Sequence, residues 1–185
     1  MNILIVSQYF WPENFRINDL AETWIKKGYE VEILTAKPNF PGGTLFENYK
    51  NNPKKYSEFY GAKIYRMPIF YRGSGTRIEI AFNYISFLVS SLIFSIIKLR
   101  KKNYNIIFTF GISPITVAIV SNFLSWMIGS KTVLWVLDLW PDILKEIGVV
   151  KNNLLYSLLK KLVKKIYTNS DIIYRWTNDT ITFHT

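Results

Sequence analysis

A carboxylate follows directly on an apolar, strand-like run in "LDLWPDIL", residues 137 to 144. In an open parallel α/β sheet, ligands bind at the carboxyl ends of the strands, and this is where Asp138 is expected. Its side chain can accept a hydrogen bond or a proton from a bound hydroxyl, so Asp138 is the candidate catalytic residue. Trp140 can offer a flat face to a ligand. Asp142 either contributes to the same site or, together with Pro141, only begins the next helix.

A second candidate site lies in "QYFWPENFRIND", residues 8 to 19, between an apolar run and a pattern typical of an amphipathic helix. The backbone N–H groups at the start of a helix commonly bind anions. Glu13 and Asn14 either bind a ligand or only cap the helix. Arg16 either supplies a cationic fork to an anion or simply lies in solvent at the helix start. All three are candidate binding residues.

The stretch "GISPITV", residues 111 to 117, repeats the order of strand, turn and helix. Ser113 is predicted as the N-cap and Pro114 as the first helical residue. This would leave a helix end open to an anion, although capping alone also explains the serine. Ser113 is therefore another candidate binding residue.

Other common sites find no support in the sequence. The pair Gly73 and Gly75 forms the only G-x-G, but Ile78 stands where a dinucleotide site needs a small residue, and the pair is not on the first strand-to-helix turn. There is no phosphate-binding loop, no serine elbow and no D-x-D pair, and the sole histidine is His184. Neither a metal nor a bound cofactor is expected.

The elements that must position these residues follow from the hydrophobic pattern. Strands are predicted at residues 2–7, 29–35, 62–69, 105–110, 131–137 and 171–174, and helices at residues 17–28, 78–99, 113–129 and 152–167. Strands that alternate with helices and are rich in Ile, Leu and Val predict an α/β fold with a Rossmann-like, doubly wound, mainly parallel sheet. With 185 residues, of which 49% are hydrophobic, one domain is expected. The absence of cysteine and of a signal-peptide pattern indicates an intracellular protein.

The charge is lopsided, with 23 Lys and Arg against 13 Asp and Glu, a net charge of +10. Nine of the basic residues form two clusters: Lys98, Arg100, Lys101 and Lys102, and then Lys151, Lys160, Lys161, Lys164 and Lys165. This distribution indicates an anionic neighbour. No nucleic acid is expected, because most aromatic residues lie inside apolar runs and do not alternate with the basic ones.

Two helical segments suggest contact with a membrane surface. Residues 80–97 carry no charge and reach the minimum length of a membrane span. However, Asn83, Ser86 and Ser90 form a polar stripe, which favours a helix that covers the sheet or lies on a bilayer surface over one that crosses it. Residues 152–167 pair a leucine face with lysines, which is typical of an interfacial helix but also of a basic helix packed on its own sheet.

The segment "ILIVSQYFWPENFRINDLAETWIKKGYEVEILTAKPNFPGG" together with "DLWPD" resembles the N-terminal domain of bacterial retaining glycosyltransferases of family 4, in particular the fucosamine-transferase type. The resemblance covers about residues 1–174, whereas the tail from 175 to 185 departs from the family pattern. These enzymes have the GT-B fold, in which two Rossmann-like domains face each other across a cleft. The N-terminal domain mainly holds the acceptor and the C-terminal one the sugar nucleotide. The resemblance therefore implies an acceptor-side half-enzyme.

The resemblance also implies roles for residues. Asp138 would accept a hydrogen bond or proton from the attacking acceptor hydroxyl and would not act as a nucleophile. The loop "NFPGG" would approach the cleft near the acceptor, although Pro-Gly-Gly can equally be a simple turn. Its candidate residues are Asn39, Pro41, Gly42 and Gly43. The donor would be a nucleotide sugar, used as substrate without a metal.

The hypothesis from the sequence is the acceptor-side half of a glycosyltransferase of capsule or O-antigen assembly. It would transfer a sugar to a lipid-linked saccharide as a cytoplasmic, peripheral protein at the inner face of the cell membrane, and would be inactive alone. Two alternatives remain open. One is a non-catalytic, membrane-docking subunit that pairs with a separate donor-binding chain, and the other is an inactive truncated remnant. An exposed cleft face could also lead to self-association.

Overall fold

The computed structural model describes residues 1–146, 148 and 150–175. The strands are β1 (Asn2–Val6), β2 (Glu30–Ala36), β3 (Glu58–Phe59), β4 (Ala62–Met67), β5 (Ile106–Gly111), β6 (Lys131–Val136) and β7 (Ile172–Arg175). The helices are α1 (Arg16–Lys26), α2 (Glu47–Asn51), α3 (Arg77–Phe94), α4 (Val117–Ile128), α5 (Asp142–Glu146) and α6 (Asn153–Thr168). A 3-10 turn, η1 (Pro53–Tyr56), follows α2, and a π-helical turn, η2 (Ser95–Leu99), extends α3.

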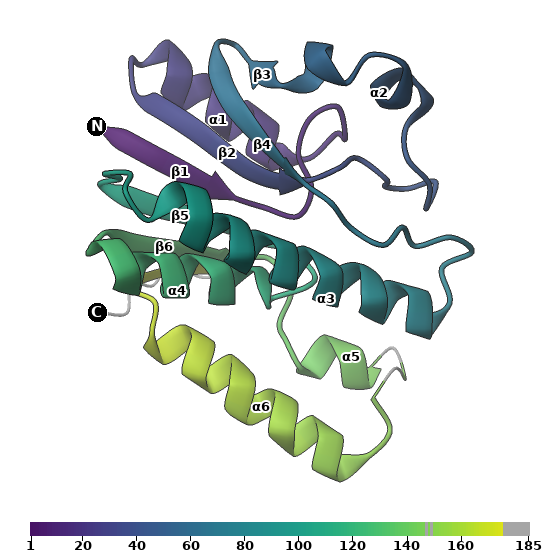
Figure 1. Ribbon diagram of the computed structural model, residues 1–185. Helices are drawn as coiled ribbons and strands as arrows, with labels where there is room; N and C mark the ends of the chain where they lie inside the picture. Colours follow the sequence, from purple (N-terminus) through teal and green to yellow (C-terminus); the bar gives the residue numbers. More distant parts are fainter. Residues whose placement is uncertain (147, 149, 176–185) are drawn as a thin grey trace.

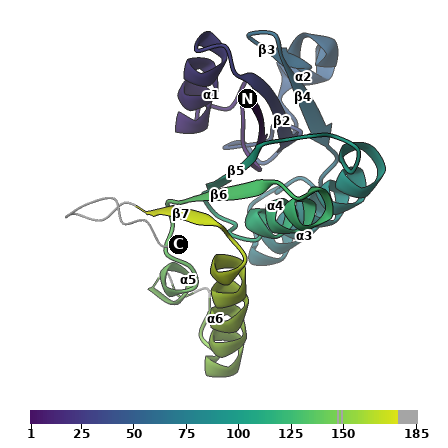
Figure 2. The same ribbon diagram turned by 90° about the vertical axis from the view of Figure 1, so that its left-hand side faces the viewer.

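All the strands form one sheet in the order β3-β4-β2-β1-β5-β6-β7. Every neighbouring pair is parallel except β3 and β4. α1 covers one face of the sheet, and α3, α4 and α6 pack on the other (Figures 1 and 2). The predicted Rossmann-like, doubly wound and mainly parallel α/β fold is confirmed.

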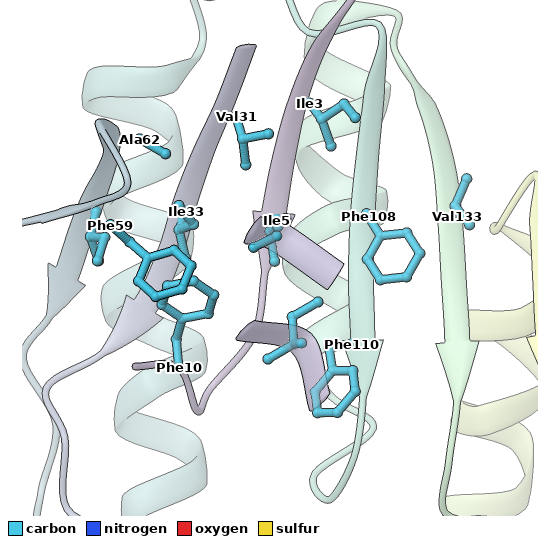
Figure 3. Packing of buried hydrophobic residues seen from close by; sticks show 13 residues of the cluster. Ile3, Ile5, Phe10, Val31, Ile33, Phe59, Ala62, Phe108, Phe110 and Val133 are labelled. Atoms are coloured by element: carbon cyan, nitrogen blue, oxygen red, sulfur yellow. The ribbon is translucent and has the colours of Figure 1, made fainter. Parts of the chain in front are cut away.

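Alternation along the strands supplies both faces with core residues. In β1, Ile3 and Ile5 point toward α1 and pack with Ile17, as part of the cluster drawn in Figure 3. Leu4 and Val6 point the other way, toward α3 and α4. Since side chains of a strand alternate between faces, one apolar run serves two helical layers. Burial of each such side chain stabilises the fold by about 1.5–3 kcal/mol.

The long apolar helix α3 buries Asn83 of the predicted polar stripe, whereas Ser86 and Ser90 are half-buried. Asn83, Ser91 and Ser95 are fully buried, in line with Phe87 and Leu99 at four-residue spacing. The opposite face is apolar and exposed; we call it the outer stripe, and it consists of Ile78, Phe82, Ile85, Val89, Ile93, Ile96 and Ile97. By length and composition, Arg77–Leu99 is the one helix in the described part of the chain that could cross a membrane. Here it packs on the sheet, which was one of the two arrangements that the polar stripe favoured.

Some short elements were not predicted. The segment between the strands predicted at 29–35 and 62–69, where no helix was predicted, contains α2, and α5 was likewise missed. The strand β3 has two residues and pairs in the antiparallel direction with β4. At the other end, β7 includes Arg175, and the rest of the predicted tail lies outside the described residues.

Candidate functional site

The loops that follow β1, β2, β4, β5 and β6 meet at the carboxyl edge of the sheet (Figure 1). The predicted site residues lie on four of these loops and on the helices that follow them. Contacts divide the edge into one cluster around Asp138 and one around Glu13. The loop after β4 supplies a further residue, Arg72, which the sequence did not suggest.

Asp138 lies one residue beyond Leu137, which follows the last residue of β6, at the carboxyl end of the strand as predicted, and its carboxylate is oriented by Ser113. The Oδ2 atom accepts hydrogen bonds from the Ser113 backbone N–H (2.9 Å) and from its hydroxyl (2.6 Å). The indole N–H of Trp140 donates to that same hydroxyl oxygen (2.9 Å). No hydrogen bond from the described residues reaches the Oδ1 atom of Asp138. This half-buried carboxylate is therefore fixed by one oxygen and has the other available as an acceptor.

The prediction that Ser113 caps a helix is wrong. Helix α4 begins at Val117, with Thr116 as its N-cap and no side-chain capping bond. The N–H groups of its first turn donate to carbonyls three residues earlier, as Val117 does to Pro114 (3.3 Å). The expected anion-binding helix end is wrong for the same reason, since these donors already have partners. Ser113 instead connects the loop after β5 to the loop after β6.

Trp140 is half-buried and packs on the core cluster formed by α4, α6 and β6. Its indole N–H is used by Ser113, so the described contacts show it as a support for the Asp138 cluster. Whether its ring also stacks on a ligand stays a prediction. Asp142 begins α5, as one of the two interpretations held, and accepts a hydrogen bond from the Tyr156 hydroxyl (2.5 Å).

The buried side chain of Glu13 connects the turn after β1 to the loop after β2. Its side chain is 2% exposed. The Oε1 atom accepts the N–H groups of Asn39 (2.9 Å) and Phe40 (2.8 Å), and Oε2 accepts that of Phe10 (3.2 Å). The capping interpretation is wrong for Glu13, because the N-cap of α1 is Phe15 and no side chain bonds to it. Glu13 therefore holds the turn after β1 against the loop after β2.

Burial dominates the electrostatics beneath these loops. It raises the pKa of Glu13 to about 7, against the opposing effect of the three N–H donors and the charge of Arg66. Burial also lowers the pKa of Arg66 to about 10. The Arg66 guanidinium donates to the carbonyls of Ala36 (3.2 Å), Tyr56 (3.4 Å) and Trp11. Both groups therefore brace the backbone of these loops.

The "NFPGG" loop docks on the loop after β4. Asn39 is fully buried, and its carbonyl accepts the N–H of Gly43 (2.8 Å). Gly43 has a φ of +74°, and a Cβ atom there would lie 2.3 Å from the carbonyl oxygen of Gly73, so only glycine fits. The Gly73 N–H donates to the Gly43 carbonyl (3.0 Å). Pro41 and Gly42 are exposed.

Asn14 and Arg16 are exposed, and Arg16 is the first residue of α1. This agrees with the interpretation of Arg16 as a solvated helix start, and no contact joins either residue to the Asp138 cluster. A cluster of three or more His, Asp or Glu side chains that could hold a metal is absent from the described residues. His184 lies outside them.

Sequence reasoning missed Arg72. Its guanidinium lies over the rings of Tyr9 (5.3 Å), Phe40 (5.6 Å) and Tyr84 (5.3 Å), each distance measured from Cζ to the ring centroid. These rings come from the loop after β1, the loop after β2 and helix α3. A single arginine in a loop carries no periodicity, so no pattern in the sequence singled it out.

Comparison with known proteins finds similarity to a solved structure but none to a known sequence family. No protein-family model matches the sequence, and no curated protein is similar to it. The crystal structure of MurG from Acinetobacter baumannii aligns with a TM-score of 0.48 at 13% sequence identity. The alignment covers 98% of this chain and 42% of MurG, so the chain spans less than half the length of that protein.

Proposed function

We propose that this chain is the acceptor-side domain of a retaining GT-B glycosyltransferase of the family-4 type. It transfers a sugar from a nucleotide sugar to a lipid-linked saccharide during assembly of a surface polysaccharide such as capsule or O-antigen. The resemblance of residues 3–43 and 138–142 supports the family. The Rossmann-like sheet, with its polar clusters at the carboxyl edge, is consistent with a ligand-binding wall at that edge.

The observation that carries this proposal is the carboxylate of Asp138, fixed at Oδ2 by Ser113 with Oδ1 available. In the proposed reaction, Oδ1 accepts a hydrogen bond from the acceptor hydroxyl. That hydroxyl oxygen forms a bond to the anomeric carbon of the donor while the bond to the nucleotide diphosphate breaks. Asp138 takes the hydroxyl proton as general base, and the diphosphate leaves with the bonding electron pair.

In this proposal the nucleotide sugar is bound by a separate domain that faces the carboxyl edge of the sheet. Asp138 and Ser113 supply a general base and its positioning group, but the described residues offer few free donors for a diphosphate at this cluster. The first-turn N–H groups of α4, for example, are paired within the loop. We therefore propose that donor contacts come from a separate Rossmann-like domain facing this edge.

A lipid-linked acceptor requires access to a membrane, and the helical face of the molecule fits one. The outer stripe of α3 lies on the side of the sheet that also carries α4 and α6. On this side Trp126 is 79% exposed, and Leu154, Leu155 and Leu158 of α6 are exposed as well. The basic cluster of Lys98, Arg100, Lys101 and Lys102 lies at the end of the outer stripe. We propose that this face rests on the anionic inner leaflet.

Deletion of the gene that encodes this chain tests the proposed function. Lipid-linked saccharides would be extracted from the deletion strain and analysed by mass spectrometry. We expect surface polysaccharide to be lost and a lipid-linked saccharide one sugar short to accumulate, with both effects reversed by the intact gene. An unchanged set of lipid-linked saccharides would contradict the proposal.

A further inference from the structure

Arg72 lies half-buried in the loop between β4 and α3, in a surrounding that fixes its side chain. Its Nη2 atom donates to the hydroxyl oxygens of Tyr84 (3.1 Å) and Tyr9. Its Nε atom donates to Oδ1 of Asn83 (3.4 Å). All of these partners are neutral. The rings of Tyr9, Tyr84 and Phe40 stand around the guanidinium plane, which arginine tolerates because it is weakly hydrated.

Within the described part of the chain, no carboxylate forms an ion pair with this cation. The ion pairs among the described residues are Lys26–Glu22, Lys102–Glu32 and Lys131–Asp171. Glu79 is the acidic residue at the junction of the same loop with α3, but it accepts hydrogen bonds from Thr76 and Ser74. Burying part of a charge costs free energy unless an opposite charge compensates. A partly buried arginine with only neutral partners is therefore suited to receive an anion.

The residues beneath Arg72 hold it in place. Asn83 is fully buried on α3, and its Oδ1 also accepts a hydrogen bond from Nε2 of the fully buried Gln8 (2.7 Å). The Nδ2 atom of Asn83 donates to the carbonyl of Phe70 (2.6 Å). The loop that carries Arg72 is thus tied to α3 and to the turn after β1, so its guanidinium is preorganised. The Nη1 atom of Arg72 makes no hydrogen bond to the described residues, so it can still donate.

An exposed apolar surface is formed by residues that lie close to Arg72 in the sequence. Phe70 is 66% exposed, and its ring lies 6.2 Å from that of Phe82. Phe82 and Ile78 are the first members of the outer stripe of α3. A ligand that carries an anion at one end and a long apolar chain at the other matches this order of cation and apolar surface. A nucleotide diphosphate has no such chain.

From these contacts we propose that Arg72, with Tyr9 and Tyr84, binds the diphosphate of a polyisoprenoid-linked acceptor, whose lipid then follows the outer stripe of α3 toward the membrane. The Nη1 atom of Arg72 can donate to a diphosphate oxygen, and the hydroxyls of Tyr9 and Tyr84, which accept from Nη2, can donate their own protons to the other oxygens. This inference rests on the proposed function for the identity of the lipid, but the anion site itself does not depend on it.

Calorimetric titration with inorganic pyrophosphate and with farnesyl diphosphate, below its aggregation concentration, tests the site. We expect both to bind, with farnesyl diphosphate the tighter ligand. Arg72→Gln should weaken binding of both by about tenfold or more, since hydrogen bonds to charged groups are lost. Arg77→Gln, which removes an exposed arginine at the start of α3, is the matched control and should change binding less than about twofold.

Circular dichroism and thermal melting show whether each variant is folded. If Arg72→Gln does not fold, Arg72→Lys provides the test. Lysine keeps the positive charge but lacks the planar guanidinium with its several N–H donors, so this variant should still weaken pyrophosphate binding. Unchanged binding in a folded Arg72 variant would overturn the site. UDP that binds as tightly as farnesyl diphosphate and depends on Arg72 would overturn the lipid assignment. The two proposals can fail separately. If deletion of the gene leaves the lipid-linked saccharides unchanged while Arg72→Gln still loses pyrophosphate binding, the proposed function is refuted and the anion site stands.

Discussion

Two carboxylates at the carboxyl edge of the sheet differ in how many of their oxygen atoms the protein itself uses. Glu13 is buried, and both of its oxygens accept backbone N–H groups. Asp138 is half-buried, and its described bonds reach only Oδ2. Glu13 therefore acts as a brace between two loops, while Asp138 keeps one oxygen without a described partner. A carboxylate thus has a structural role at one position and a proposed chemical role at the other.

The pKa of Glu13 makes the stability of the fold depend on pH. Because its pKa is raised from 4.5 to about 7, folding favours the protonated carboxyl. This contribution is complete below about pH 4.5 and is lost as the pH rises through about 7. The free energy of unfolding should therefore fall, by an amount on the order of 3 kcal/mol, across this range. Urea unfolding at several pH values measures this fall.

The matched comparison is Glu13→Gln, which keeps an oxygen for Asn39 and Phe40 but cannot titrate. Its free energy of unfolding should lack this fall, whereas Glu58→Gln, an exposed control on β3, should retain it. Equal pH dependence in the wild-type protein and Glu13→Gln would show that Glu13 does not titrate in this range.

The position of Asp138 could be predicted because a carboxylate directly after an apolar strand has only one place to go in a parallel sheet. The role of Ser113 could not, because its partner is 25 residues away and the turn satisfies the first N–H groups of α4 with its own carbonyls. Arg72 was out of reach for a similar reason: its hydroxyl partner Tyr9 is 63 residues distant. Contacts between loops leave no local pattern.

At the scale of elements, α3 shows what an apolar run leaves undetermined. Its stripe of Asn and Ser is visible in the sequence, but which side faces the sheet is decided by packing. The structure buries Asn83 because its amide bonds to Gln8 and to the carbonyl of Phe70. The apolar side is therefore exposed. By contrast, the strands and long helices were predicted well, while five-residue helices such as α2 are too short to show a period.

We expect the helical face to bind anionic vesicles in a salt-sensitive way. Each basic residue near the surface contributes about 1 kcal/mol, so replacing Lys98, Arg100 and Lys101 by Gln should weaken binding by about 10²-fold. Replacing the exposed Lys27, Lys50 and Lys54, which lie on other elements, is the matched control and should have little effect. Vesicle sedimentation with phosphatidylglycerol and with phosphatidylcholine measures this, and equal binding to both lipids would exclude the electrostatic contribution.

At the scale of the whole molecule, the described residues form one Rossmann-like sheet that is covered by helices on both faces and carries its polar clusters at one edge. Glycosyl transfer requires donor and acceptor to be held together in a site that excludes water. One wall provides the proposed general base, the brace formed by Glu13 and the proposed anion site, but it does not enclose a donor. The proposed function therefore requires a facing domain.

We accordingly expect the purified 185-residue chain to bind no nucleotide sugar in the micromolar range and to transfer none. Calorimetry with uridine and guanosine diphosphate sugars, alongside a transfer assay on a lipid-linked acceptor, measures both. Addition of a donor-binding domain should restore transfer. Micromolar donor binding by the chain alone would show that the edge of this sheet holds the donor as well.

The most direct test of the central claim is the turnover of Asp138→Asn in the transferase assembled with its donor-binding domain. A general base contributes about 10²-fold or more, so turnover should fall by at least about 10²-fold while the melting temperature stays close to that of the wild-type assembly. Asp19→Asn, an exposed carboxylate on α1, is the control and should keep full turnover. Wild-type turnover in a folded Asp138→Asn variant would contradict the assignment of Asp138 as the group that accepts the acceptor's proton.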